Sequence, residues 1–243
     1  MKIAILSDVL ISSGGGLHMA LTSFSTFKKL NIKDVEISYI VTNKELKKIL
    51  EKELNIKTLL FDKKKLTNRI LTNLNKFNLI KYLNIKFKKK NIFEKFLIEN
   101  NIDLVFFLSP SSLVLLCQNV NFIYTIWEFQ HKLTPFFPEY KSNYVDSKET
   151  INEFAIKKAF KIVTANNTDK NNFSKIYNVD LDRLHTLMFP PFISKDEKKI
   201  SNIELDKFIK NKKFVFYPAQ YWSHKNHRYI VDAFKRIEDE FYC

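Results

Sequence analysis

Short apolar runs alternate with longer amphipathic stretches along most of the chain. The apolar runs are rich in β-branched and aromatic residues, and they predict strands at Ile3–Leu6, Glu36–Val41, Lys57–Leu60, Leu104–Phe107, Asn121–Thr125, Lys161–Thr164 and His185–Leu187. The amphipathic stretches predict helices near Leu17–Phe27, Lys44–Leu54, Leu66–Leu83, Ile92–Asn100, Lys148–Phe160 and Asp169–Tyr177. Apolar strands that alternate with helices indicate a parallel sheet covered on both faces. Right-handed crossovers then predict an α/β, Rossmann-like sandwich.

The sequence favours a domain boundary at Pro190-Pro191, because two prolines keep the backbone extended and stop a helix. We expect an N-terminal Rossmann-like domain over residues 1–190. Residues 191–243 then form a linker and the first βα unit of a second Rossmann-like domain, with a strand at Phe214–Tyr217 and a helix at about Asn226–Glu240. One βα unit cannot form a parallel sheet alone, since its strand needs neighbours. Either the second domain is truncated in this chain or the unit rests on the first domain.

Composition and charge narrow the class of protein only in part. The chain has 40 Lys and Arg against 26 Asp and Glu, a net charge of +14 that favours an anionic partner. Heavy use of Phe, Lys, Asn and Ile also fits an AT-rich genome, so the charge alone decides little. Cys117 and Cys243 lie too far apart for a CxxC motif. Asp8 interrupts the N-terminal apolar run too early for the apolar core of a signal peptide. No apolar run reaches the roughly 20 residues of a membrane span. We expect a cytoplasmic protein.

The three glycines of the chain, Gly14, Gly15 and Gly16, are consecutive and stand between the first predicted strand and the following helix. Backbone without side chains can approach a ligand closely, and a helix N-terminus attracts phosphate. We interpret the glycines as a phosphate or substrate loop, with a flexible turn as the alternative. The spacing is not GxGxxG and no acid follows the second strand, which argues against a dinucleotide.

Two further clusters follow predicted strands. Trp127-Glu128-Phe129-Gln130-His131 comes after the fifth strand, where Glu128 and His131 suit recognition of sugar hydroxyls and proton transfer. The alternative is a proline-rich loop whose aromatic residues pack on the core. The second cluster, Gln220-Tyr221-Trp222-Ser223-His224-Lys225-Asn226-His227, places Lys225 near a helix N-terminus, where it could reach a diphosphate. His224 and His227 have no third ligand nearby, so we expect no metal site.

Four segments together resemble the family 4 retaining glycosyltransferases, which have the GT-B fold of two Rossmann-like domains. They are the strand and glycines from Ile3 to His18, the Trp127–His131 loop with its Pro-Phe-Phe-Pro continuation, the segment Val163–Tyr177, and Phe216–His227, the most specific match. The resemblance spans nearly the whole chain. It implies transfer of a sugar from a nucleotide-sugar donor to a glycan or lipid-linked acceptor, in the biosynthesis of polysaccharide or lipopolysaccharide.

The resemblance also implies roles for individual residues. Gly14, Gly15 and Gly16 would contact the donor diphosphate, and Lys225 would neutralise it as the leaving group departs. His131 would lie near the transferred sugar, with Glu128 as a second catalytic candidate. Trp127, Gln220, His224 and Asn226 would line the rest of the cleft. No metal or cofactor is implied beyond the nucleotide sugar as co-substrate.

This chain departs from the family pattern at three places. Many members have a His directly after the fifth strand, where this chain has Trp127, and an Arg before the second-domain lysine, where it has Ala219 and Gln220. The donor-binding carboxylates of the family lie beyond the position that corresponds to residue 243. We therefore expect a chain truncated within its C-terminal domain.

The stretch from Lys63 to Lys95 contains eleven Lys and Arg and one Glu, a net +10 (11 − 1). A basic amphipathic surface with aromatic residues suits anionic lipid headgroups, so we expect peripheral association with the inner face of the cell membrane. The alternative is a solvated helix face. Two other functions stay open: an inactive fragment that binds acceptor or membrane only, and a basic Rossmann-like module for nucleic acid. The second is disfavoured, because no RNP, KH or zinc pattern is present.

Overall fold

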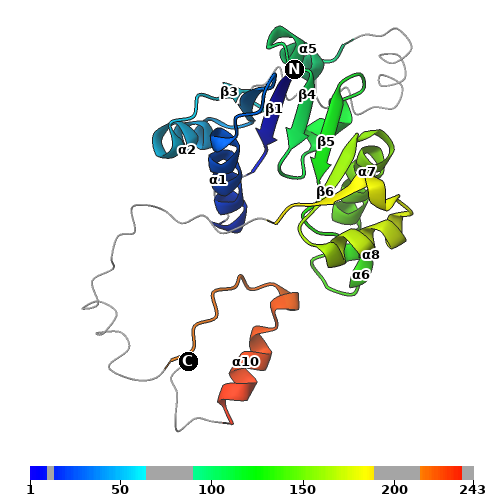
Figure 1. The fold of residues 1–243 in the computed structure, drawn as a ribbon. Helices are drawn as coiled ribbons and strands as arrows, with labels where there is room; N and C mark the ends of the chain where they lie inside the picture. The colour runs from blue at the N-terminus through cyan, green and yellow to red at the C-terminus, as the bar shows by residue number, and fades with distance from the viewer. Residues whose placement is uncertain (10–13, 64–89, 189–213, 237–243) are drawn as a thin grey trace, which may run out of the picture. The chain divides into compact units, whose positions relative to one another are not determined.

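The computed structural model describes residues 1–9, 14–63, 90–188 and 214–236 (Figure 1). The chain divides into two compact units. The first unit comprises Met1–Phe129 and Asp146–Phe192, and the second comprises Gln130–Val145 and Ile193–Cys243. The expected domain boundary at residue 190 and the expected helix Leu66–Leu83 both lie outside the described residues, so both stay predictions.

The first unit is built on a parallel sheet of seven strands in the order β3-β2-β1-β4-β5-β6-β7. The strands are β1 (Lys2–Ser7), β2 (Glu36–Val41), β3 (Leu59–Leu60), β4 (Leu104–Phe107), β5 (Asn121–Thr125), β6 (Lys161–Thr164) and β7 (Leu184–Thr186). All seven predicted strands are present, and four of them have the predicted ends. The sheet confirms the predicted α/β, Rossmann-like fold.

Helices cover both faces of this sheet (Figure 1). They are α1 (Gly14–Lys29), α2 (Lys44–Leu54), α5 (Ile92–Glu99), α7 (Ser142–Lys158) and α8 (Asn167–Tyr177). On one face, side chains of α1 and α2 such as Phe24 and Leu50 pack with Ile5 of β1. On the other face, Phe93 of α5 and Phe154 of α7 share a core with the alternate β1 side chains, Ala4 and Leu6. The period-2 alternation of a strand thus divides the core into two layers.

Local capping explains why several helices begin where they do. Asn43 has extended backbone and accepts a hydrogen bond from the Leu46 N–H, which caps α2. Asn91 and Glu94 form a capping box at the start of α5. The Glu94 carboxylate is 1% exposed and also accepts hydrogen bonds from the backbone N–H groups of Gln118 and Asn119, at 3.0 and 2.7 Å. Glu94 therefore joins α5 to the segment that leads into β5.

Three features differ from the sequence prediction. Helix α1 begins at Gly14 instead of Leu17, so the glycines form its first turn and not a preceding loop. Helix α7 begins at Ser142, six residues before the predicted start at Lys148. The sequence pattern also missed the short helical turns η1 (Ser112–Leu116), α6 (Gln130–Leu133) and η2 (Leu181–Arg183), because they are too short to show a helical period.

In the second unit, the described part of the C-terminal segment consists of the 3₁₀ turn η3 (Ser223–Lys225) and helix α10 (His227–Phe234). The expected strand at Phe214–Tyr217 is represented by a single bridge residue, Phe214. A strand is stable only beside other strands, which accounts for this difference. Among the helices in the described part of the chain, none is both long and apolar enough to span a membrane.

Substituting Glu94→Ala should lower the free energy of unfolding by about 2–3 kcal/mol, because it removes the buried acceptor of hydrogen bonds from the backbone N–H groups of Asn91, Gln118 and Asn119. Urea denaturation followed by circular dichroism measures the change. Glu99→Ala is the matched control, since Glu99 is exposed in the last turn of the same helix. Equal effects of the two substitutions would contradict this role for Glu94.

Candidate functional site

The order of strands in the sheet reverses direction beside β1. The chain runs from β1 through β2 to β3 on one side, and from β4 through β7 on the other. In open α/β sheets, ligands bind outside the carboxyl ends of the strands at such a switch point. The glycines form the first turn of α1, the helix that follows β1, and Trp127 follows β5, so both belong to this edge of the first unit. We therefore take this edge as the candidate site.

The glycines at the start of α1 are not equivalent. A Cβ atom added to Gly16 would lie 3.1 Å from Val9 Cγ1 and 3.3 Å from Cη2 of the Trp127 ring. A Cβ atom added to Gly15 would have nothing within 4 Å, and Gly15 is exposed. No described glycine has a positive φ, so backbone strain does not explain either residue. Packing thus explains why position 16 is a glycine, whereas the absence of a side chain at Gly15 leaves open space beside the helix N-terminus.

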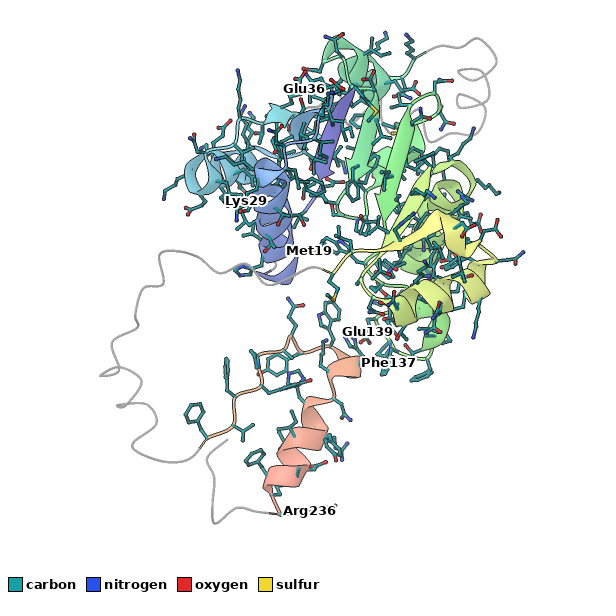
Figure 2. All side chains as sticks on the ribbon, in the orientation of Figure 1. Met19, Lys29, Glu36, Phe137, Glu139 and Arg236 are labelled. Atoms are coloured by element: carbon teal, nitrogen blue, oxygen red, sulfur yellow. The ribbon has the colours of Figure 1, made fainter. Side chains whose placement is uncertain are left out.

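Trp127 supports the first turn of α1 from the side of β5. Its ring lies against the position of Gly16, and its Nε1–H donates a 3.0 Å hydrogen bond to the Leu108 carbonyl, which follows β4. The indole is therefore fixed at both its polar and its apolar edge. Helix α1 ends in a basic last turn that contains Lys28 and Lys29 (Figure 2). These cations interact favourably with the negative end of the helix dipole.

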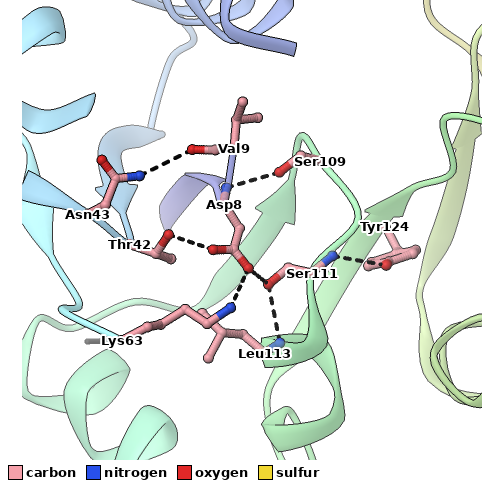
Figure 3. Close-up of polar contacts among 9 residues, drawn as sticks. All are labelled: Asp8, Val9, Thr42, Asn43, Lys63, Ser109, Ser111, Leu113 and Tyr124. Atoms are coloured by element: carbon pink, nitrogen blue, oxygen red, sulfur yellow. Dashed lines mark hydrogen bonds and ion pairs between the residues drawn. The ribbon is translucent and has the colours of Figure 1, made fainter. Parts of the chain in front are cut away.

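A partly buried carboxylate that the sequence analysis missed lies at the same edge (Figure 3). Asp8 directly follows β1 and its side chain is 12% exposed. Its carboxylate accepts hydrogen bonds from Thr42 Oγ1 (2.5 Å) and Ser111 Oγ (2.5 Å), and it pairs with Lys63 Nζ (2.6 Å). These partners follow β2, β4 and β3. Polar residues within a few positions after strands β1 to β4 were the sequence signal that could have identified the cluster.

The Asp8 cluster continues toward β5 through Ser111. The Ser111 side chain also accepts a 3.2 Å hydrogen bond from the Leu113 N–H, and the Ser111 N–H donates to the Tyr124 hydroxyl at 3.1 Å (Figure 3). Tyr124 is fully buried, and this burial raises the pKa of its hydroxyl well above the usual value, with a smaller contribution from the negative charge of Asp8. Tyr124 therefore stays neutral in the physiological range.

Glu128, a predicted catalytic residue, forms an ion pair with Lys148 of α7. The Glu128 side chain is 39% exposed, whereas that of Lys148 is only 15% exposed. Burial lowers the pKa of Lys148 to about 8, despite the opposing effect of the Glu149 charge. Lys148 thus lies beside a carboxylate at a position where burial disfavours its own charged form.

In the second unit, His131 lies in α6 with 3% exposure, and its ring contacts the Tyr140 ring edge-on at 6.2 Å. Glu139 accepts hydrogen bonds from His224, through Nδ1 at 2.7 Å and through the backbone N–H at 3.2 Å. Desolvation works to raise the pKa of Glu139, but the hydrogen bonds from His224 outweigh it and hold the pKa below the usual value. Glu139 thus ties the segment after α6 to η3.

The other predicted residues of the segment Gln220–His227 have mostly local contacts. The Gln220 side chain accepts a 2.6 Å hydrogen bond from Trp222 Nε1, and Asn226 caps α10 from a left-handed conformation. His227 packs against Tyr221 at 4.7 Å and lies 3.2 Å from the Ala219 carbonyl through Nε2. The Lys225 side chain is exposed at the end of η3. His224 and His227 thus face different partners, and no group of three metal-ligating side chains exists among the described residues.

Within the first unit, Gly16 lies against the ring of Trp127. The predicted roles of all the site residues in both units stay predictions. Sequence reasoning did not assign the charged residues Asp8, Lys63 and Lys148 to this region.

No protein-family model and no curated protein matches the chain. A glycosyltransferase from Rickettsia africae has a similar structure, with a TM-score of 0.55 and 19% identity over 100% of this chain and 59% of that chain. The UDP-GlcNAc 2-epimerase from Neisseria meningitidis has a TM-score of 0.45 and 13% identity, over 88% of this chain and 56% of its own. The lipopolysaccharide outer core galactosyltransferase WaaB has a TM-score of 0.43 and 14% identity, over 82% and 50%. This chain therefore shares the fold of the Rickettsia protein and spans less than two thirds of its length.

Gly16→Ala should destabilise the protein by about 1–3 kcal/mol, because the new methyl group overpacks the contact with Val9 and Trp127. Gly15→Ala should leave the stability unchanged or raise it by up to about 1 kcal/mol, since its Cβ meets nothing and alanine favours the helix. Thermal unfolding of the two variants measures the difference. The same loss of stability in both variants would contradict the packing around Gly16.

Lys148→Met should become more destabilising as the pH rises from 7.5 to 10. The pKa of Lys148 is about 8 in the folded protein and has its usual value near 10.5 when unfolded, so between these values the unfolded state binds more protons. Lys148 therefore makes the wild-type free energy of unfolding rise with pH, by at most about 1.4 kcal/mol per unit. Urea denaturation of both proteins across this range tests the prediction. A difference that stays constant with pH would contradict it.

Proposed function

We propose that this chain forms the acceptor-side domain of a GT-B glycosyltransferase, together with the beginning of its donor-side domain. The enzyme would transfer a sugar from a nucleotide-sugar donor to a glycan or lipid-linked acceptor. The fold shared with the Rickettsia africae glycosyltransferase supports this proposal. The observation that carries it is Gly15, an exposed glycine with open space beside the N-terminus of α1 at the switch point of the sheet.

The N-terminus of α1 has the properties that a diphosphate site requires. The first backbone N–H groups of a helix have no partner within the helix, and the helix dipole adds positive potential there. α1 has 16 residues and no acidic side chain in its first turn, so nothing in that turn opposes an anion. Gly14 and Gly15 let a phosphate approach the backbone, while Gly16 lets Trp127 pack behind them. In this proposal the turn binds the donor diphosphate.

From the second unit, we propose Lys225 as a further diphosphate-binding residue. Its side chain is exposed, and its backbone is fixed by hydrogen bonds from its N–H to the Trp222 carbonyl and from the Tyr217 hydroxyl to its own carbonyl, at 2.9 and 3.0 Å. A fixed backbone with an extended ammonium group suits neutralisation of a leaving diphosphate. In a retaining mechanism without a protein nucleophile, stabilising the negative charge of the leaving diphosphate would be the main contribution of the protein.

Glu128 and His131 are proposed to act on the sugar or acceptor. Glu128 pairs with Lys148, and its carboxylate can accept a hydrogen bond from a sugar hydroxyl. His131 is buried in α6, and its imidazole can accept or donate one proton. The residues Trp127, Gln220, His224 and Asn226 would support these groups and contribute contacts to ligands.

We further propose that the enzyme acts in the assembly of cell-surface polysaccharide or glycolipid, at the inner face of the cell membrane. The support is the net +10 charge of the stretch from Lys63 to Lys95, which suits anionic headgroups. Most of this stretch lies outside the described residues.

Isothermal titration calorimetry of the full chain with UDP, GDP and a panel of their sugar conjugates tests the proposal. We expect binding that weakens at least about tenfold in Gly15→Asp, because a carboxylate in the turn repels the diphosphate. The same acid favours a helix N-terminus, so the variant should stay folded. Lys225→Ala should weaken binding by a similar factor.

Lys235→Ala is the matched control, since Lys235 is an exposed lysine that pairs with Asp232 at 3.6 Å after α10. It should bind as the wild type does. No binding of any nucleotide by folded wild-type chain would contradict a working donor site in this chain. Salt-sensitive binding to DNA or RNA, without nucleotide-sugar binding, would favour the nucleic-acid function instead.

A further inference from the structure

Protein groups occupy most of the acceptor positions of the Asp8 carboxylate. Two hydroxyl groups and one ammonium group point at its two oxygens, from Thr42, Ser111 and Lys63 (Figure 3). Because a carboxylate only accepts hydrogen bonds, the Ser111 hydroxyl donates to Asp8, and it accepts from the Leu113 N–H. A carboxylate with three such donors has little capacity left for a ligand. The contacts of Asp8 are thus with other parts of the protein.

The backbone on both sides of Asp8 is fixed as well. The Asp8 N–H donates a 2.9 Å hydrogen bond to Ser109 Oγ, and the Val9 carbonyl accepts a 3.1 Å hydrogen bond from Asn43 Nδ2 (Figure 3). The residues that follow β2 and β4 thus hold the first two residues after β1. The chain leaves the sheet from a fixed point with a fixed direction.

Val9 transmits this constraint to the glycines. The Val9 side chain is 5% exposed, and its Cγ1 atom lies 3.1 Å from the Cβ position of Gly16. Trp127 contacts the same position from the other strand, β5. The first turn of α1 therefore packs on the side chains of Val9 and Trp127. Val9 directly follows Asp8, whose contacts fix the backbone at this point.

We propose that Asp8 is a positioning residue for the phosphate-binding turn, which it orients through Val9 and Gly16. This inference rests on the proposed function, because it assigns Asp8 a role in ligand binding that goes beyond stability. Fixing a turn before the ligand arrives lowers the entropy that binding must otherwise remove. Loss of the Asp8 contacts would leave the turn able to fold but less well oriented.

Two variants test the role of Asp8. Asp8→Asn removes the charge that binds Lys63, and Thr42→Val removes one hydroxyl donor without changing any charge. In both, hydrogen exchange of the amides in the second turn of α1, the first that can form hydrogen bonds within the helix, should become about tenfold faster or more, since local opening becomes easier. The dissociation constant for UDP or GDP, whichever the wild-type chain binds more tightly, should rise about fivefold.

Asp103→Asn is the matched control. Asp103 accepts a 2.6 Å hydrogen bond from the Lys2 N–H, so it binds the opposite end of the same strand, β1. This variant should change neither the exchange of α1 nor nucleotide affinity relative to wild type, even where it lowers the overall stability.

The outcomes separate the two proposals. Equal exchange of α1 in the Asp8, Thr42 and Asp103 variants would overturn the positioning role. Faster exchange with unchanged nucleotide affinity would overturn it too, since the orientation of the turn would then not matter for binding. If the wild-type chain binds no nucleotide, the proposed function fails and the ligand-binding role of Asp8 fails with it. If Gly15→Asp abolishes binding but the Asp8 and Thr42 variants do not weaken it, only the inference about Asp8 fails.

Discussion

The pairing of β1 with β2 on one side and β4 on the other is the constraint on which the rest of the first unit depends. Because all three strands are parallel, the chain leaves each of them at the same edge, and polar backbone ends converge there. A side chain with several acceptor positions can join these ends, and the carboxylate of Asp8 does so. Polar side-chain contacts thereby hold the strand ends together.

Three buried or half-buried charges in this unit are stabilised in different ways. Glu94 is compensated by backbone N–H groups, Asp8 by hydroxyl groups and one lysine, and Lys148 by acidic neighbours that do not fully offset its burial. Burial lowers the pKa of Lys148 to about 8. The charge of Lys148 therefore changes just above physiological pH, and Lys148 pairs with Glu128, which follows β5.

The sequence was sufficient for the strands but only in part for the site. Strands such as Leu104–Phe107 are short apolar runs that are buried on both faces, and this pattern depends on local sequence alone. The start of α1 was missed because glycine is a poor helix former, and here Trp127 and Val9, far apart in sequence, pack against Gly16 and offset that preference. The partners of Asp8 include Ser111, 103 residues away, so no local pattern could reveal the contact. Polar residues after neighbouring strands predict only that they lie at one edge, and not which of them form hydrogen bonds.

The contact among Val9, Gly16 and Trp127 links three positions that lie on separate segments of the chain. A side chain at position 16 requires more room, which only a smaller residue at position 9 or 127 can give. Among homologous proteins these three positions should consequently vary together, with alanine or serine at position 16 occurring beside a smaller ring or a shorter aliphatic side chain. A lineage that replaces Trp127 with histidine would gain a polar group at the edge and lose the constraint that keeps position 16 a glycine. The packing of one turn thus limits the order in which substitutions can accumulate during evolution.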